Sequence, residues 1–168
     1  MGVALDLAQL TARADRVVVA EVLSVNAAWD GEAHKTILTT IDFAINETWK
    51  GGEVGKSRRL TLVQVGGTLG GVAMTVEGQP VFTPGERAVL FLRGPLDRLA
   101  IVGMGQGKRR LVFDGKMGGW VAAAGDRSAA VARDPDGNLR PAEPEAPMRL
   151  EQLREHVRSF VSGESRGK

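Results

Sequence analysis

Alternation of apolar and polar residues dominates the middle of the chain and predicts a protein made mainly of β-strands. From Arg16 the side chains follow a period of two residues, and the run ends at the turn signal Asp30-Gly31. The clearest strand spans about 35–49, where isoleucines and a phenylalanine share one face and mostly polar residues share the other. This pattern is typical of a sheet with one buried face. Further strands are expected at 58–66, 71–77, 87–93, 98–104, 108–113 and 118–123.

Helical spacing is confined to the two ends of the chain. Residues 5–14 predict a short helix, in which Asp6 and Gln9 have the spacing of a capping box. Residues 148–161 predict a second, amphipathic helix that packs on the domain. Its apolar stripe consists of Leu150, Leu153, Val157 and Val161.

The remaining segments mark the domain organisation. Residues 124–147 contain four prolines and few large apolar side chains, so they are expected to form a surface connection. Residues 162–168 are expected to be a disordered tail, and residues 1–161 to form one domain. Many short strands at near-regular spacing favour a β-sandwich or a closed barrel, with glycines at the bends.

Several motifs follow one another in a distinctive order over residues 5–160. They are ADRVVVAEV at 14–22, the segment 43–51 ending in WKG, ERAVLFLR at 86–93, LAI at 99–101 and the closing amphipathic helix. This order resembles the netrin-like domain, whose best-known members are the tissue inhibitors of metalloproteinases. The spacing is also similar to that of a group of exported bacterial proteins.

The resemblance implies a mostly β, OB-like (netrin-like) small barrel with an N-terminal helix and a packed C-terminal helix. It also implies export to the periplasm, the outer membrane or the exterior, with the signal peptide outside this sequence; a cytoplasmic location is the alternative. Inhibition of metalloproteinases in that family requires an N-terminal cysteine and disulfides. The chain has no cysteine, so this activity is not carried over.

Composition narrows the range of functions. The chain has 168 residues and a net charge of +2, which is too small to indicate nucleic-acid binding by itself. The absence of cysteine excludes disulfides, thiol catalysis and thiolate metal sites. No apolar run approaches the roughly 20 residues of a membrane helix, so no membrane span is expected.

Three loop motifs come close to known ligand sites without matching them. The glycines at 103–107 are wrongly spaced for a dinucleotide loop, and a strand follows them instead of a helix. Residues 51–57 (GGEVGKS) enclose one residue too few for a phosphate-binding P-loop. Residues 134–138 (DPDGN) fit a surface turn better than a calcium loop. No cofactor is therefore expected.

No catalytic or metal-binding residues are recognisable. Zinc needs three or four ligands, and the two histidines, His34 and His156, are expected to face solvent. No serine elbow is present, although a triad of distant residues is left open.

A partner-binding surface is the positive hypothesis. Loops held by a rigid barrel concentrate binding residues, glycine permits close approach, and arginine donates in a fork to carboxylate or phosphate. Lys56, Arg58 and Arg59 are candidates to join this surface. The predicted surface consists of Gly66, Gly67, Gly70, Gly71, Gly105, Gly107, Lys108, Arg109 and Arg110.

Aromatic residues are expected to be structural. Phe43, Phe91 and Phe113 lie within apolar alternation and are predicted to be core, and Trp49 to be partly buried at a strand end. The sequence thus predicts a non-catalytic protein-interaction or ligand-binding module of the bacterial cell envelope or exterior, whose partner is a protein or an envelope component. The alternatives are an OB-type binder of single-stranded nucleic acid and a hydrolase whose site the sequence does not reveal.

Overall fold

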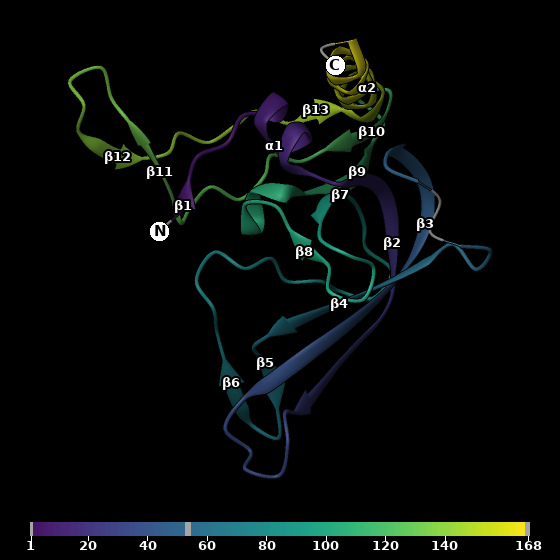
Figure 1. The fold of residues 1–168 in the computed structure, drawn as a ribbon, viewed down its shortest axis with the longest axis vertical. Coiled ribbons are helices and arrows are strands. Elements are labelled where there is room, and N and C mark those ends of the chain that lie inside the picture. Colours follow the sequence, from purple (N-terminus) through teal and green to yellow (C-terminus); the bar gives the residue numbers. More distant parts are fainter. Residues whose placement is uncertain (1, 53–54, 167–168) are drawn as a thin grey trace.

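The computed structural model describes residues 2–52 and 55–166 and is rich in antiparallel β-structure (Figure 1). The mostly β fold class is confirmed. The elements are β1 (Gly2–Val3), α1 (Leu7–Arg13), β2 (Arg16–Trp29), β3 (Ile37–Lys50), β4 (Arg59–Val65), β5 (Gly67–Leu69), β6 (Val72–Met74), β7 (Arg87–Arg93), β8 (Ala100–Ile101), the 3₁₀ helix η1 (Met104–Gly107), β9 (Lys108–Asp114), β10 (Gly119–Ala122), β11 (Ala130–Arg133), β12 (Leu139–Pro141), β13 (Met148–Arg149) and α2 (Leu150–Arg166).

The main sheet has eight strands in the order β13-β10-β9-β7-β2-β3-β4, with β8 paired to β7. Its two end strands are not paired with each other, so within the described residues the sheet does not close into a barrel. The expected strand at 98–104 is cut to two residues, because Gly103 turns into the left-handed region at φ +66° and η1 begins at Met104. The sheet therefore stays open, and of the two architectures that the strand spacing favours, the closed barrel is not formed.

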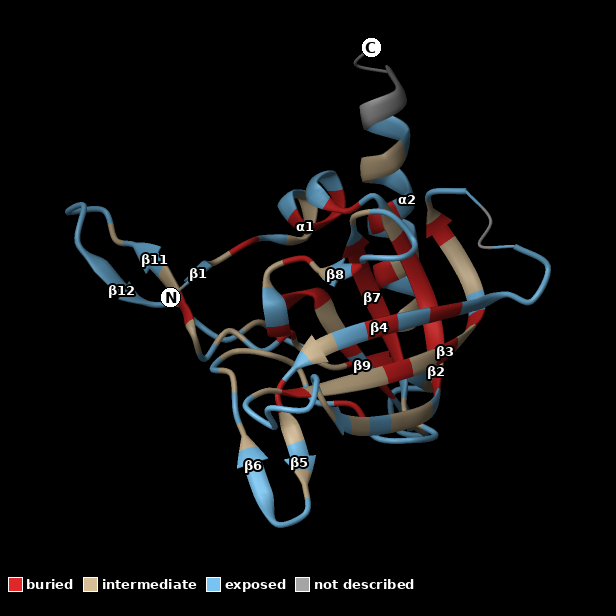
Figure 2. Cartoon of the chain, turned by 60° about the horizontal axis from the view of Figure 1, so that its bottom comes forward, coloured by how far each residue is buried: buried red, intermediate tan, exposed pale blue. Residues whose placement is uncertain are grey.

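The long β2–β3 hairpin supplies buried residues to both faces of the sheet. Each strand has 14 residues, and shifts in register between them mark β-bulges that increase the local twist. Val17 and Val19 belong to a core on one face, whereas Val18 and Ala20 belong to a second core on the other. The central strands are therefore covered on both sides, as the buried stretches in Figure 2 show.

The two terminal helices cover the first of these cores. The predicted capping box is confirmed, because Gln9 N donates to Asp6 Oδ1 (2.8 Å) and Asp6 N to Gln9 Oε1 (2.9 Å). On α2, Leu153 and Val157 are buried in this core beside α1. The helix continues to Arg166, beyond the predicted end at 161, and residues 167–168 lie outside the described part.

The segment 124–147 is more structured than its composition predicts. Strands β11 and β12 form an antiparallel hairpin, and β1 pairs with β11 in parallel through Gly2 opposite Ala130. The turn of this hairpin is the predicted DPDGN turn, in which Gly137 has a φ of +87°. These strands are short and lack apolar alternation, which explains why the pattern did not reveal them. None of the described helices is long and apolar enough to span a membrane.

Candidate functional site

The residues of the predicted binding surface are distributed over three places. Gly66 and Gly67 follow β4, whereas Gly70 and Gly71 form the tip of the β5–β6 hairpin. The pair Gly105 and Gly107 lies in η1, and the three basic residues begin β9. Strands β7, β2 and β3 lie between β9 and β4 in the sheet. Arg59 at the start of β4 therefore does not join Lys108, Arg109 and Arg110 on β9 in one basic surface, as the sequence suggested.

Close packing within the chain accounts for the glycines of η1. A Cβ at Gly107 would lie 2.2 Å from the Val102 carbonyl oxygen, and one at Gly105 would lie 2.9 Å from Asp126 Cβ. These glycines were expected to let a partner approach the backbone closely. Other parts of the same chain occupy that space instead. By contrast, Gly70 and Gly71 have nothing near them and supply the two positive φ angles of a tight hairpin turn.

The predicted role of Arg109 on an accessible surface is wrong, because its side chain is only 6% exposed. Its guanidinium donates to both oxygens of Glu145, at 2.7 and 3.1 Å. Lys108 Nζ donates to Glu86 Oε1 (2.9 Å), and Arg110 Nε lies 3.4 Å from the other oxygen of Glu86. Two glutamates distant in sequence thus neutralise most of the basic group, a pairing that sequence alone does not reveal.

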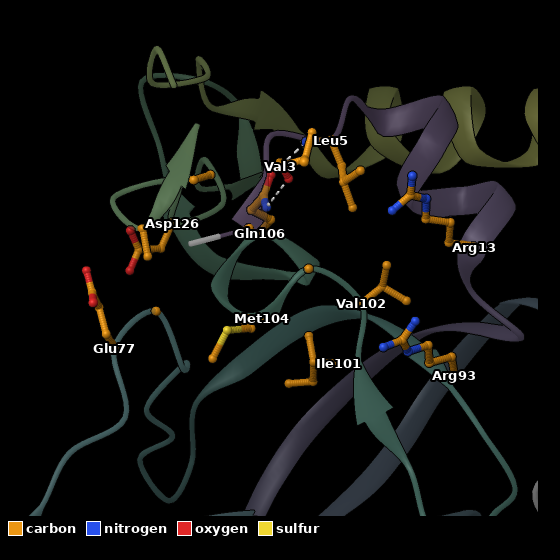
Figure 3. Close-up of a pocket in the computed structure, with 15 residues that line it drawn as sticks. Val3, Leu5, Arg13, Glu77, Arg93, Ile101, Val102, Met104, Gln106 and Asp126 are labelled. Atoms are coloured by element: carbon orange, nitrogen blue, oxygen red, sulfur yellow. Dashed lines mark hydrogen bonds between the residues drawn. The ribbon is translucent and has the colours of Figure 1, made fainter. Parts of the chain in front are cut away.

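A cleft of about 440 Å³ that is lined by charged and apolar side chains lies beside η1 (Figure 3). We call it the η1 cleft. Its volume is within the range of about 300–1,000 Å³ that is usual for small-molecule sites. Its apolar lining comes from the N-terminal segment and from the end of β8 with the residues that follow it: Val3, Leu5, Ile101, Val102 and Met104.

Gln106 holds the N-terminal wall of the η1 cleft in place. This side chain is 3% exposed, accepts a hydrogen bond from Leu5 N (2.8 Å) and donates one to Val3 O (3.1 Å). The neighbouring Met104 has a φ of +56°, which is uncommon for a residue other than glycine. Its side chain is 40% exposed and lies between the walls of the cleft in Figure 3.

Opposite charges lie at opposite ends of the η1 cleft. Arg13 and Arg93 lie at one end, and Glu77 and Asp126 at the other (Figure 3). None of these four side chains has an ion-pair partner among the described residues. Hydrogen bonds from Ser128 lower the pKa of the Asp126 carboxyl. The cleft therefore has positive charge at one end, negative charge at the other end and apolar side chains between them.

A second pocket of about 410 Å³ lies between the β5–β6 hairpin and the ends of β2 and β3. Gly66 and Gly67 line it, together with Val25, Ile41 and Phe82. Both predicted glycine loops thus border a cavity. This second pocket is lined mainly by apolar and uncharged polar side chains, so it lacks the charges that would orient a ligand.

An exposed aromatic pair was missed by the sequence analysis. Phe113 is 68% exposed, so its predicted place in the core is wrong, and it packs edge-to-face on Trp120 with ring centres 5.7 Å apart. It lies near the end of β9, where the neighbouring residues are also poorly buried. The Arg87 guanidinium lies 5.3 Å from the Trp120 ring and pairs with Glu21 (3.1 Å). Phe43 and Phe91 are core as predicted, and Trp49 is buried.

Neither histidine lines the η1 cleft, whose charged side chains are Arg13, Glu77, Arg93 and Asp126. His34 is exposed and stacks on Trp29, and His156 is exposed on α2, so the predicted exposure of both is confirmed. In the part of the chain that the structure describes, no three residues of His, Cys, Asp or Glu are grouped as metal ligands.

The comparisons with known proteins assign no family to this chain. It matches none of the protein-family models, and no curated protein matches it in sequence.

Proposed function

We propose that this protein is a non-catalytic binding module that uses the η1 cleft to hold an elongated ligand with opposite charges at its ends. The separation of Arg13 and Arg93 from Glu77 and Asp126 carries the proposal. Arginine binds carboxylates through its forked donors, and carboxylates attract ammonium groups. A short peptide in extended form has this charge distribution, with an apolar middle that fits the floor of the cleft.

The resemblance to the netrin-like domain supports an OB-related fold for this module. In OB-like topology a meander of three strands is joined by later strands on the other side of its first strand. Here β2, β3 and β4 form such a meander, and β7 pairs with the free side of β2. The same resemblance supports a location in the bacterial envelope or outside the cell, where the ligand would be a protein or an envelope component. Fractionation of cells that produce the full gene product tests this location.

Binding of nucleic acid receives less support. Oligonucleotide sites combine aromatic platforms with free cationic side chains. Phe113 and Trp120 offer a platform, but Arg87 beside them is paired with Glu21. A peptide is therefore the ligand class that the charges of the described residues favour.

Calorimetric titration with a tetrapeptide tests the proposed function. The probe has an N-terminal lysine, two leucines and a C-terminal glutamate; the comparison probe is acetylated and amidated, with alanine in place of the lysine and glutamate. We expect the charged probe to bind at least about 10-fold more tightly, which corresponds to about 1.4 kcal/mol. Arg93→Glu should remove this difference, whereas Lys35→Glu makes the same charge change at an exposed site outside the cleft. Equal binding of the two probes to the wild type would refute the proposal.

A further inference from the structure

The register of β4 on β3 determines which of its backbone groups point away from the sheet. Gly66 N donates to Ile37 O (2.7 Å) and Ile45 N donates to Arg58 O (2.8 Å). Hydrogen-bonded pairs alternate along an antiparallel ladder, so the even-numbered residues of β4 direct their N–H and C=O groups to β3. The odd-numbered residues direct theirs to the free edge.

This free edge has little protection. The Val65 carbonyl accepts a hydrogen bond from Gln79 Nε2 (2.7 Å). The backbone groups of Thr61 and Val63 have no protein partner within the described residues, since β4 pairs with β3 alone. Natural sheets block such edges with proline, lysine or a bulge, and the sequence of β4, RLTLVQV, contains neither proline nor lysine. Its edge is therefore able to pair with another strand.

A groove runs beside this edge, at the gap where the barrel fails to close. It has a volume of about 330 Å³. Leu99 belongs to the same buried core as Leu60 and Leu62, so apolar side chains underlie the gap between β4 and the 96–99 segment. We call it the β4 groove, and its lining residues are Thr61, Val63, Leu96, Asp97, Arg98 and Leu99.

Charge and space indicate what occupies the β4 groove. Arg59, at the start of β4, and Arg98, in the opposite wall, are exposed and have no ion-pair partner in the described part of the chain. Asp97 is the one carboxylate of the lining, and the neighbouring Asp42 is half-buried and accepts hydrogen bonds from Ser24 and Thr61. The exposed charges of the rim therefore have an excess of one positive charge, which favours an acidic partner. The 96–99 segment forms the opposite wall of the groove, so an added strand would lie between this segment and β4.

We propose that the β4 groove binds an extended acidic segment of a partner protein, which pairs with β4 as an added strand. Main-chain hydrogen bonds from Thr61 and Val63 would provide affinity, and alternate side chains of the segment would reach the apolar gap, as in other cases of β-strand addition. This site involves other residues than the η1 cleft, and each of the two proposals stands if the other fails.

Fluorescence polarisation with a labelled synthetic peptide tests the proposal. The probe alternates valine and threonine over seven residues and carries two aspartates at each end; a second probe carries lysines instead. We expect the acidic probe to bind at least about 10-fold more tightly than the basic one. Val63→Pro removes an N–H that points outward, so the ladder to β3 is kept while binding is lost. Val63→Ala, which keeps that N–H, should retain binding.

Amide NMR of the unmodified protein makes the test independent of how the proline variant folds. The acidic probe should shift the amide signals of Thr61 and Val63 and leave those of Leu60 and Leu62 less affected. Equal affinity for the two probes, or shifts confined to other residues, would overturn the proposal. A dimer of the protein alone that Val63→Pro dissociates would also overturn it, because the edge would then belong to a second copy of the chain.

Discussion

A single carboxylate, that of Glu145, holds two arginines from different parts of the chain. It accepts two hydrogen bonds from Arg109, and Arg127 Nε lies 2.9 Å away without the alignment of a hydrogen bond. Arg127 also donates to the carbonyl oxygens of Leu5 (2.8 Å) and Glu143 (3.0 Å). This group therefore ties the segment 124–147 to both β9 and the N-terminal wall of the η1 cleft.

Glu145→Gln should destabilise the protein strongly, because it leaves two poorly solvated guanidinium groups without a counter-charge. We expect the free energy of unfolding to fall by about 3 kcal/mol, measured by urea denaturation. Glu143→Gln changes an exposed carboxylate in the same segment and serves as the control. It should alter the free energy of unfolding by less than about 0.5 kcal/mol. A similar loss of free energy of unfolding in both variants would show that the pairing of Glu145 with the arginines contributes little to stability.

At the scale of elements, α2 is an integral part of the fold. Leu153 is 2% exposed and Val157 is fully buried, and both pack in the core that α1 and β2 share. The helix is also joined to β3 by two hydrogen bonds between Arg154 and Glu47, at 2.8 and 3.0 Å. One apolar stripe and one ion pair thus fix the position of this helix on the sheet.

Leu153→Ala should reduce the free energy of unfolding by about 2–4 kcal/mol, because it removes buried methyl groups and leaves a cavity. Thermal or urea denaturation measures this change. Gln152→Ala, at the adjacent exposed position of the same helix, provides the control and should have little effect. An unchanged denaturation midpoint for Leu153→Ala would contradict the burial of this side chain.

The ion pair between α2 and β3 also makes stability depend on pH. The hydrogen bonds from Arg154 lower the pKa of the Glu47 carboxyl below its ordinary value of 4.5. A carboxyl with a lower pKa in the folded protein stabilises the fold above its unfolded pKa, and this contribution is lost as the pH falls through the folded pKa. Glu47→Gln should therefore lose less stability than wild type between pH 6 and about pH 3. Chemical denaturation at each pH measures the free energy of unfolding of both proteins. The same dependence on pH in wild type and Glu47→Gln would contradict this expectation.

At the scale of the whole molecule, the sequence predicted the elements better than their assembly. The long strands and both helices follow from periodicity, and Asp6 with Gln9 located a cap that the structure contains. The shortness of β8 was not predictable, because no pattern in the sequence shows that the chain turns at Gly103 into a 3₁₀ helix. Likewise, Phe113 alternates like a core residue but is exposed near the end of its strand.

The candidate sites were predictable only in part. Glycine spacing located the loop that borders the η1 cleft, although the glycines themselves serve internal packing. The charged ends of the cleft come from Arg13, Glu77, Arg93 and Asp126, which are distant in sequence. No local pattern connects them, because only the folded chain brings them to one cavity.

The pairing of β1 with β11 has a consequence for the order of folding. The meander from β2 to β4 and the β9–β10 hairpin join neighbours in sequence, whereas β1 must meet a strand near residue 130. Contacts between distant segments carry the larger entropic cost of ordering the chain, so local pairings are expected to form first. The N-terminal strand is therefore expected to dock after these local pairings have formed, and its docking completes the wall that Gln106 holds. We expect the protein to acquire its sheet before its ligand cleft, so that an early folding intermediate is already β-structured but does not yet bind.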